Sequence, residues 1–175
     1  IGREAVSYLN SRGHQTIGFV TDDLFGQVGQ ERYQGYKDAV SELHIESLPE
    51  LVFSSQTIDS FKKHLRTFLP TALVVKDDLV ALRLIQWLNN QGIKIPKDYS
   101  IISINNSSFA EIMHPFLTTY DINIQELGKE SVRKLVANLK DENTEPQKVT
   151  IPFHLIERES VTSIYRDHKK MVRQK

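Results

Sequence analysis

An alternation of short apolar runs with helical patterns constrains the fold of this chain more than any other feature of its sequence. The apolar runs are Thr16 to Val20, Leu51 to Phe53, Ala72 to Val75 and Ile101 to Ile104. They are apolar on both faces, which is typical of strands in a parallel sheet that helices cover on both sides. The segments between them carry apolar residues at helical spacing. The pattern predicts an α/β fold with a doubly wound parallel sheet and right-handed crossovers.

The pattern changes after Pro115, where an extended stretch, a helix that carries leucines, a polar loop and a strand follow in turn. Their expected bounds are Leu117 to Tyr120, Leu127 to Leu139, Lys140 to Gln147 and Val149 to Ile156. Asn123, with Glu126 three residues later, resembles a capping box at the start of this helix. The charged tail, 166–175, is predicted to be flexible.

The charge balance argues against nucleic-acid binding by these residues alone. The chain has 22 Lys and Arg against 22 Asp and Glu, a formal net charge of +0 and a pI near 7.2. A domain that binds DNA phosphates usually carries a basic excess. The absence of cysteine excludes disulfides and is compatible with a cytoplasmic location. No apolar run has the length that a membrane span needs, so we expect no membrane partner.

Neither catalytic nor metal-ligating patterns are visible. The histidines occur singly, at His14, His44, His64, His114, His154 and His168. Ser54-Ser55 and Ser107-Ser108 lack the flanking glycines of a nucleophile elbow. The sequence has no P-loop and no dinucleotide-binding fingerprint. We therefore expect no enzymatic activity, no metal site and no cofactor.

Polar residues follow three of the predicted strands, at the edge where ligands bind in open α/β sheets. They are Thr21-Asp22-Asp23, Lys76-Asp77-Asp78 and Asn105-Asn106. Such carboxylates and amides can hydrogen-bond sugar hydroxyls, and Phe25 or Phe53 can cover a sugar ring or belong to the core. Asp77 or Asp78 can instead cap the next helix, a role that fits Asp78 better. The asparagines can equally be turn residues, and the residues alone do not decide.

Seven short segments occur in an order and spacing that indicate a family. They are Gly2 to Leu9 with Gly13-His14, Glu31 to Tyr36, Asp77 to Ala81, Gly92 to Ile101, Pro115 to Thr119, Glu126 to Gly128, and Leu155 to Ser160. Together they cover nearly the whole chain and resemble the LacI/GalR family of transcriptional regulators. The resemblance implies a type I periplasmic-binding-protein-like effector domain with two lobes.

The same resemblance implies how the chain is divided. Residues 1–120 would form the C-terminal lobe, 121–153 a helix and strand of the N-terminal lobe, 154–165 the return strand and 166–175 a flexible tail. The helix-turn-helix, the hinge helix and the first strands of the N-terminal lobe are not among these residues. The helix near Glu126 to Lys140 would then lack the sheet that it covers. We expect oligomeric contacts or weak order there.

Effector contacts carry over from the family to particular positions. Arg32 matches an arginine that commonly contacts the effector. Asp77 stands where the family usually has Asn, and Asn105 stands where it usually has Asp. Ser55 replaces an aromatic residue that often follows the second strand, and Phe25 is a further candidate contact. The implied effector is a sugar or a sugar derivative.

Family dimers form through the helix after the third strand and the segment after the fourth, which implies a homodimer here. The candidate interface residues are Leu79, Leu82, Arg83, Gln86, Phe109, Ile112 and Met113. Exposed apolar residues in both places would suit a twofold interface, although Leu82 can equally face the core. The implied function is effector sensing and dimerisation in a cytoplasmic repressor that contacts operator DNA only through its N-terminal headpiece. The alternative is a solute-binding protein of a sugar transporter, which shares the fold; the segments 115–119 and 155–160 favour the regulator.

Overall fold

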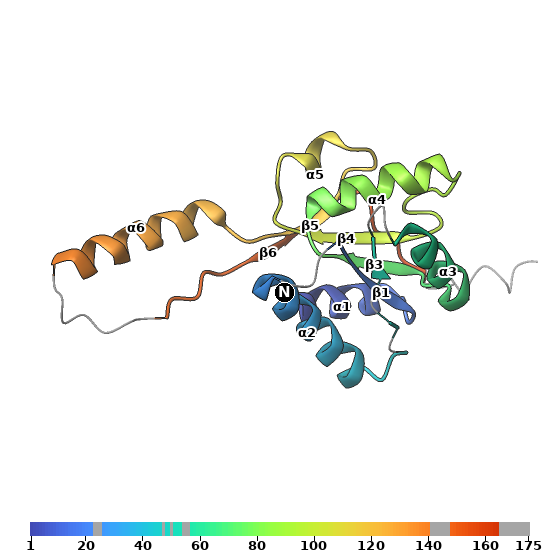
Figure 1. The fold of residues 1–175 in the computed structure, drawn as a ribbon, viewed down its shortest axis with the longest axis horizontal. Helices are drawn as coiled ribbons and strands as arrows, with labels where there is room; N and C mark the ends of the chain where they lie inside the picture. Colours follow the sequence, from blue (N-terminus) through green and yellow to red (C-terminus); the bar gives the residue numbers. More distant parts are fainter. Residues whose placement is uncertain (23–25, 47, 50, 54–56, 141–147, 165–175) are drawn as a thin grey trace, which may run out of the picture.

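A six-stranded sheet forms the centre of the computed structural model, which describes residues 1–22, 26–46, 48–49, 51–53, 57–140 and 148–164 (Figure 1). The strand order is β2-β1-β3-β4-β5-β6. The strands are β1 (Ile17–Thr21), β2 (Leu51–Val52), β3 (Ala72–Val75), β4 (Ser100–Ile104), β5 (Thr118–Asp121) and β6 (His154–Ile156). The predictions for Phe25, Ser55 and the tail 166–175 lie outside the described residues.

The first five strands are parallel, and β6 is antiparallel to β5. This arrangement confirms the predicted α/β sheet. The strand expected over Val149 to Ile156 is wrong in its extent, because only His154 to Ile156 pair with β5. The reason is the length of the partner: β5 ends at Asp121, so it offers no backbone groups with which residues before His154 could pair.

Helices cover both faces of the sheet. They are α1 (Gly2–Ser11), α2 (Gln27–Glu42), α3 (Ile58–Phe68), α4 (Asp78–Asn90) and α5 (Phe109–Ile112), with α6 (Ile124–Lys140) apart from them. Figure 1 shows α1 and α2 on one face and α3, α4 and α5 on the other. Each face has its own apolar core, one centred on Phe19 and Tyr36, the other on Phe61 and Leu84. This double coverage explains why every residue of β1, β3 and β4 is buried.

The backbones of α1 and α2 touch where glycines occur. A Cβ atom at Gly2 would lie 2.1 Å from the carbonyl oxygen of Arg32, and one at Gly35 would lie 3.1 Å from the backbone nitrogen of Arg3. Only a residue without a side chain allows this approach. The contact fixes the backbone of Arg32 against α1.

The segment after β6 fastens the chain end to the sheet through Ser160, which is fully buried. The Ser160 hydroxyl donates to the carbonyl of Ile101 (2.5 Å) and accepts from the backbone N–H of Thr118 (2.8 Å). The Ser160 carbonyl also accepts from the N–H of Ile101 (2.8 Å). One side chain thus satisfies backbone groups of β4 and β5 together.

We expect Ser160→Ala to lower the free energy of unfolding by about 1–3 kcal/mol, because it leaves buried backbone groups without a partner. Denaturant unfolding of the variant measures this loss. Ser108→Ala, at an exposed position, serves as the matched control and should change the free energy by less than about 0.5 kcal/mol. Equal stabilities for the two variants would contradict the role given to Ser160.

The helix α6 projects away from the sheet (Figure 1), and none of its residues is buried. Its leucines are open to solvent, with Leu135 60% and Leu139 76% exposed. The predicted capping box is wrong, since Asn123 has a φ of 52° and an N-cap residue needs an extended backbone. The N–H of Asn123 donates instead to Asp121 Oδ1 (2.7 Å). The helix forms at the predicted place with its apolar face uncovered.

We expect the backbone amides of α6 to exchange rapidly with solvent in a monomeric sample, because most helical stability in proteins comes from packing of the apolar face, and no residue of α6 is buried. Hydrogen exchange read by mass spectrometry tests this, with α4 as the internal reference. Protection of α6 that rises with protein concentration would indicate oligomeric contacts. A monomer in which α6 is as protected as α4 would contradict the expectation.

Candidate functional site

Polar side chains gather where β1, β3 and β4 end, because these neighbouring strands run parallel. Arg32 reaches this edge from α2. Its Nη2 donates to Asn105 Oδ1 (2.9 Å), and its Nη1 donates to the backbone carbonyl of Lys76 (2.7 Å). Arg32 therefore links the end of β3 to the end of β4. The structure thus brings two predicted site residues, Arg32 and Asn105, into direct contact.

The environment of Arg32 is partly buried and acidic. Burial lowers the pKa of Arg32 from its usual value, while the carboxylates of Asp77 and Asp78 act in the opposite direction. The two hydrogen bonds engage two of the five N–H donors of a guanidinium group. No other described residue accepts a hydrogen bond from this guanidinium, so within the described part of the chain its other donors can serve a ligand.

A row of alternating charges continues this arrangement toward β1. Lys76 Nζ lies 2.5 Å from Asp22 Oδ1 and 3.7 Å from Asp77 Oδ2. Asp77 Oδ1 accepts the backbone N–H of Val80 (2.9 Å), so Asp77 is the N-cap of α4. The preference for Asp78 as the capping residue is therefore wrong. We call Asp22, Arg32, Lys76, Asp77 and Asn105 the edge site.

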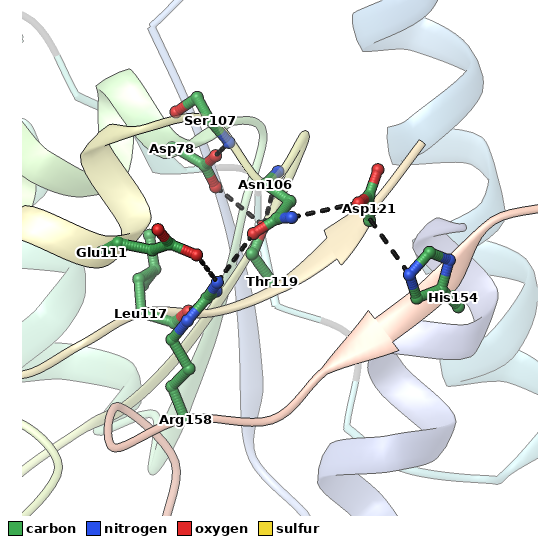
Figure 2. Close-up of polar contacts among 9 residues, drawn as sticks. All are labelled: Asp78, Asn106, Ser107, Glu111, Leu117, Thr119, Asp121, His154 and Arg158. Atoms are coloured by element: carbon green, nitrogen blue, oxygen red, sulfur yellow. Dashed lines mark hydrogen bonds and ion pairs between the residues drawn. The ribbon is translucent and has the colours of Figure 1, made fainter. Parts of the chain in front are cut away.

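Asp78 has a different task, which the sequence did not predict. It is 1% exposed and lies against β4 and β5. Asp78 Oδ1 accepts the hydroxyls of Ser103 (2.5 Å) and Thr119 (2.8 Å), and Oδ2 accepts the N–H of Ser107 (2.6 Å). Figure 2 shows the carboxylate between Ser107 and Thr119. Asp78 thus ties the first turn of α4 to two strands behind the edge site.

We expect Asp78→Asn to lower the free energy of unfolding by about 1–3 kcal/mol, because the amide nitrogen would face a hydrogen-bond donor in a buried position. The adjacent Asp77→Asn is the matched control. Asparagine also caps helices, so the control should change the free energy by less than about 0.5 kcal/mol. Chemical denaturation compares the two, and a larger loss for Asp77→Asn would reverse the assignment.

Asn105 and Asn106 are turn residues and hydrogen-bonding residues at once. Both have positive φ, 121° and 50°. Asn105 accepts from Arg32, whereas Asn106 contacts Arg158 and Asp121 (Figure 2). Arg158 was not among the predicted site residues. Its only sequence signal is its place in the segment Leu155 to Ser160, which by itself carries no chemical role.

The other candidate residues are distributed between core and surface. Phe53 is half-buried and packs edge-on against Phe61 and Trp87, with ring centroids 5.1 Å and 5.8 Å apart, so it belongs to the core. Leu79 (41%) and Ile112 (70%) are exposed. Arg83 and Gln86 are exposed as well, while Leu82 and Phe109 are half-buried, and Leu82 packs on the core.

The expectation that Met113 is exposed is wrong. Its side chain is 6% exposed and belongs to the same core cluster as Leu84. The cause is the shortness of α5, a single turn that ends at Ile112. The chain leaves this turn with Ile112 facing solvent and Met113 facing the core.

The part of the chain that the structure describes contains neither a cluster of metal ligands nor a membrane-spanning helix. No three His, Asp or Glu side chains in the described part of the chain gather where they could hold a metal ion. Among the described helices, none is both long and apolar enough to span a bilayer.

A parallel sheet of this strand order, with helices on both faces and one antiparallel strand at its edge, is a doubly wound α/β fold that several protein families share. Residues 6–161 match the family model described as a periplasmic binding protein-like domain, and the chain belongs to this family. Its relatives are LacI-family transcriptional regulators, which confirms the resemblance and the fold class predicted from the sequence.

Individual relatives show how far the similarity extends. The ribose operon repressor of Haemophilus influenzae is 31% identical over 169 residues, covering 93% of this chain and 51% of that protein. The HTH-type transcriptional repressor PurR of Aliivibrio salmonicida is 31% identical over 166 residues, covering 91% of this chain and 50% of that protein. A LacI family regulator from Enterococcus faecium, solved with bound ribose, has a TM-score of 0.81 and 30% identity, covering 93% and 62%. The chain spans about half the length of the curated relatives it matches.

Proposed function

We propose that this chain is the effector-sensing and dimerising part of a DNA-binding transcriptional repressor that responds to a sugar or a sugar derivative. The observation that carries this proposal is the placement of Arg32. Its guanidinium is held by Asn105 and by the Lys76 carbonyl at the sheet edge where ligands of such folds bind. The ribose operon repressor and the ribose-bound regulator among the relatives support a sugar as the effector class.

The chemistry of the edge site suits a polyhydroxyl ligand. Arg32 offers donors, Asp77 and Asn105 offer acceptors, and a sugar hydroxyl can use both. The site also balances its charges, since Lys76 lies against Asp22 and Asp77. A neutral ligand therefore does not have to compensate a net charge there. We propose Arg32, Asp77 and Asn105 as effector contacts, and sensing rather than catalysis as the role.

The dimer is proposed to form through α4 and α5. Leu79 and Ile112 are exposed apolar residues on these two helices, and an isologous interface pairs one such patch with its own copy. Operator DNA would be contacted by an N-terminal headpiece, because these residues have a formal net charge of +0 and thus lack the basic excess that usually binds phosphates. We also propose that 1–120 and 154–165 belong to one lobe and 121–153 to the other, in a cytoplasmic protein.

A solute-binding protein would share the fold and the edge site. The relatives named above are transcriptional regulators, which favours the repressor. A signal for export ahead of these residues in the full-length protein would favour the solute-binding alternative.

Titration of D-ribose and other neutral sugars into the full-length protein, followed by calorimetry, tests the proposal. We expect Arg32→Ala to weaken binding by about 10- to 100-fold, because it removes charge-assisted hydrogen bonds. Arg66→Ala, in the last turn of α3, is the matched control and should bind as the unaltered protein does. Unchanged affinity in Arg32→Ala would remove Arg32 from the site, and the absence of binding by every sugar would contradict the effector class.

A further inference from the structure

Two consecutive asparagines at the end of β4 bond to different parts of the molecule. Asn105 meets Arg32 of α2, and Asn106 meets the segment that returns from β6. Their φ angles, 121° and 50°, are both positive. Asparagine tolerates the left-handed region, where a φ of 50° lies, but the 121° of Asn105 is outside that region and needs surroundings that hold it. The contacts of Asn106 therefore help to decide how Asn105 is presented to the edge site.

The side-chain amide of Asn106 has a defined orientation. Its Oδ1 accepts from Arg158 Nη2 (2.9 Å), and its Nδ2 donates to Asp121 Oδ2 (3.0 Å). Figure 2 shows Asn106 between these two side chains. Reversing the amide would place donor against donor at Arg158 and oxygen against a carboxylate at Asp121. The charges on either side thus hold Asn106 in one rotamer.

Arg158 is itself held on all sides, and its side chain is 14% exposed. Its Nη1 donates to the carbonyl of Leu117 (2.9 Å), and its Nη2 also reaches Glu111 Oε1 (2.8 Å) on α5. Its backbone N–H donates to Thr118 Oγ1 (2.9 Å). The planar guanidinium serves the Leu117, Asn106 and Glu111 oxygens at once, an arrangement that the compact ammonium of lysine does not reproduce.

Asp121 and Arg158 lie on the two segments that connect the sheet with α6. Asp121 is the last residue of β5, where the chain leaves the sheet toward α6. Arg158 lies just beyond β6, where the chain returns. Asn106 therefore bridges the outgoing and returning segments, and it is covalently joined to Asn105 of the edge site.

We propose that Arg158 is a positioning residue which, acting through Asn106, holds Asn105 in place to accept from Arg32. Arg158 itself has no bond to the edge site. The inference rests on the proposed function only in taking Arg32 and Asn105 as effector contacts. The Arg32–Asn105 hydrogen bond itself forms without any ligand, so its stability can be measured on the protein alone.

NMR spectroscopy of the ¹⁵N-labelled full chain, without added sugar, tests the inference through the exchange of the Arg32 side-chain N–H groups with water. We expect Arg158→Lys to accelerate this exchange roughly fivefold, the effect of losing one ordinary hydrogen bond. Arg12→Lys is the matched control. Arg12 pairs with Glu157 on the same returning segment, and its replacement should leave the Arg32 exchange unchanged.

Asn106→Ala provides a second variant if Arg158→Lys fails to fold, and it should accelerate the Arg32 exchange by a similar factor. Amide exchange in β3 reports on the fold as a whole. Unchanged Arg32 exchange in the folded variants would overturn the inference, as would an equal acceleration in β3, which would mean general loosening. Because no sugar is present, failure of the sugar titrations leaves this result untouched, and failure here leaves the proposed sugar site standing.

Discussion

The buried carboxylate of Asp78 is the interaction on which the geometry of the sheet edge depends. A charge that is removed from water must be met by hydrogen bonds, and the partners come from β4, from β5 and from the loop between them. These bonds add a direct polar link to the apolar packing of α4 on the sheet. The carboxylate therefore fixes β4 and β5 against the first turn of α4, next to the more open polar residues of the edge site.

The edge site draws on both layers of helices. Arg32 comes from α2, whose apolar side chains pack on one face, and Asp77 begins α4 on the other. The sheet lies between them, and its strand ends bring the two contributions into contact. The geometry of the edge site therefore depends on the distance between the two helix layers. A ligand that binds there and shifts one layer would also change the contacts made by the other, which suits a sensing role.

The fold could be predicted because its signals are local. Each buried strand is a short run that is apolar on both faces, and each helix carries its own stripe, so neighbouring residues suffice to find them. The exact first residue of α4 could not be predicted in this way. Asp77 and Asp78 are chemically identical, and a shift of one residue in the helix start decides which of them caps and which is buried. Met113 is similar, since the direction of its side chain depends on where the single turn of α5 ends.

Part of the site could not be found from sequence for a different reason. The partners of the Arg158 guanidinium are Asn106, Glu111 and the Leu117 carbonyl, which lie more than forty residues earlier. No spacing rule in the sequence connects them, because the antiparallel pairing of β6 with β5 brings them together. Arg32 could be found only through a family resemblance. Its contact with Asn105 spans 73 residues and depends on the parallel order of β1, β3 and β4.

The meeting of α1 and α2 at Gly2 has a consequence for how such a site can change. The carbonyl of Arg32 rests against a glycine backbone, so the starting point of the arginine is set by main chain and not by any replaceable side chain. Substitutions at Asp22, Asp77 or Asn105 can alter what the guanidinium meets, while the place from which it reaches stays constant. Ligand preference can therefore diverge among related sequences around one fixed anchor.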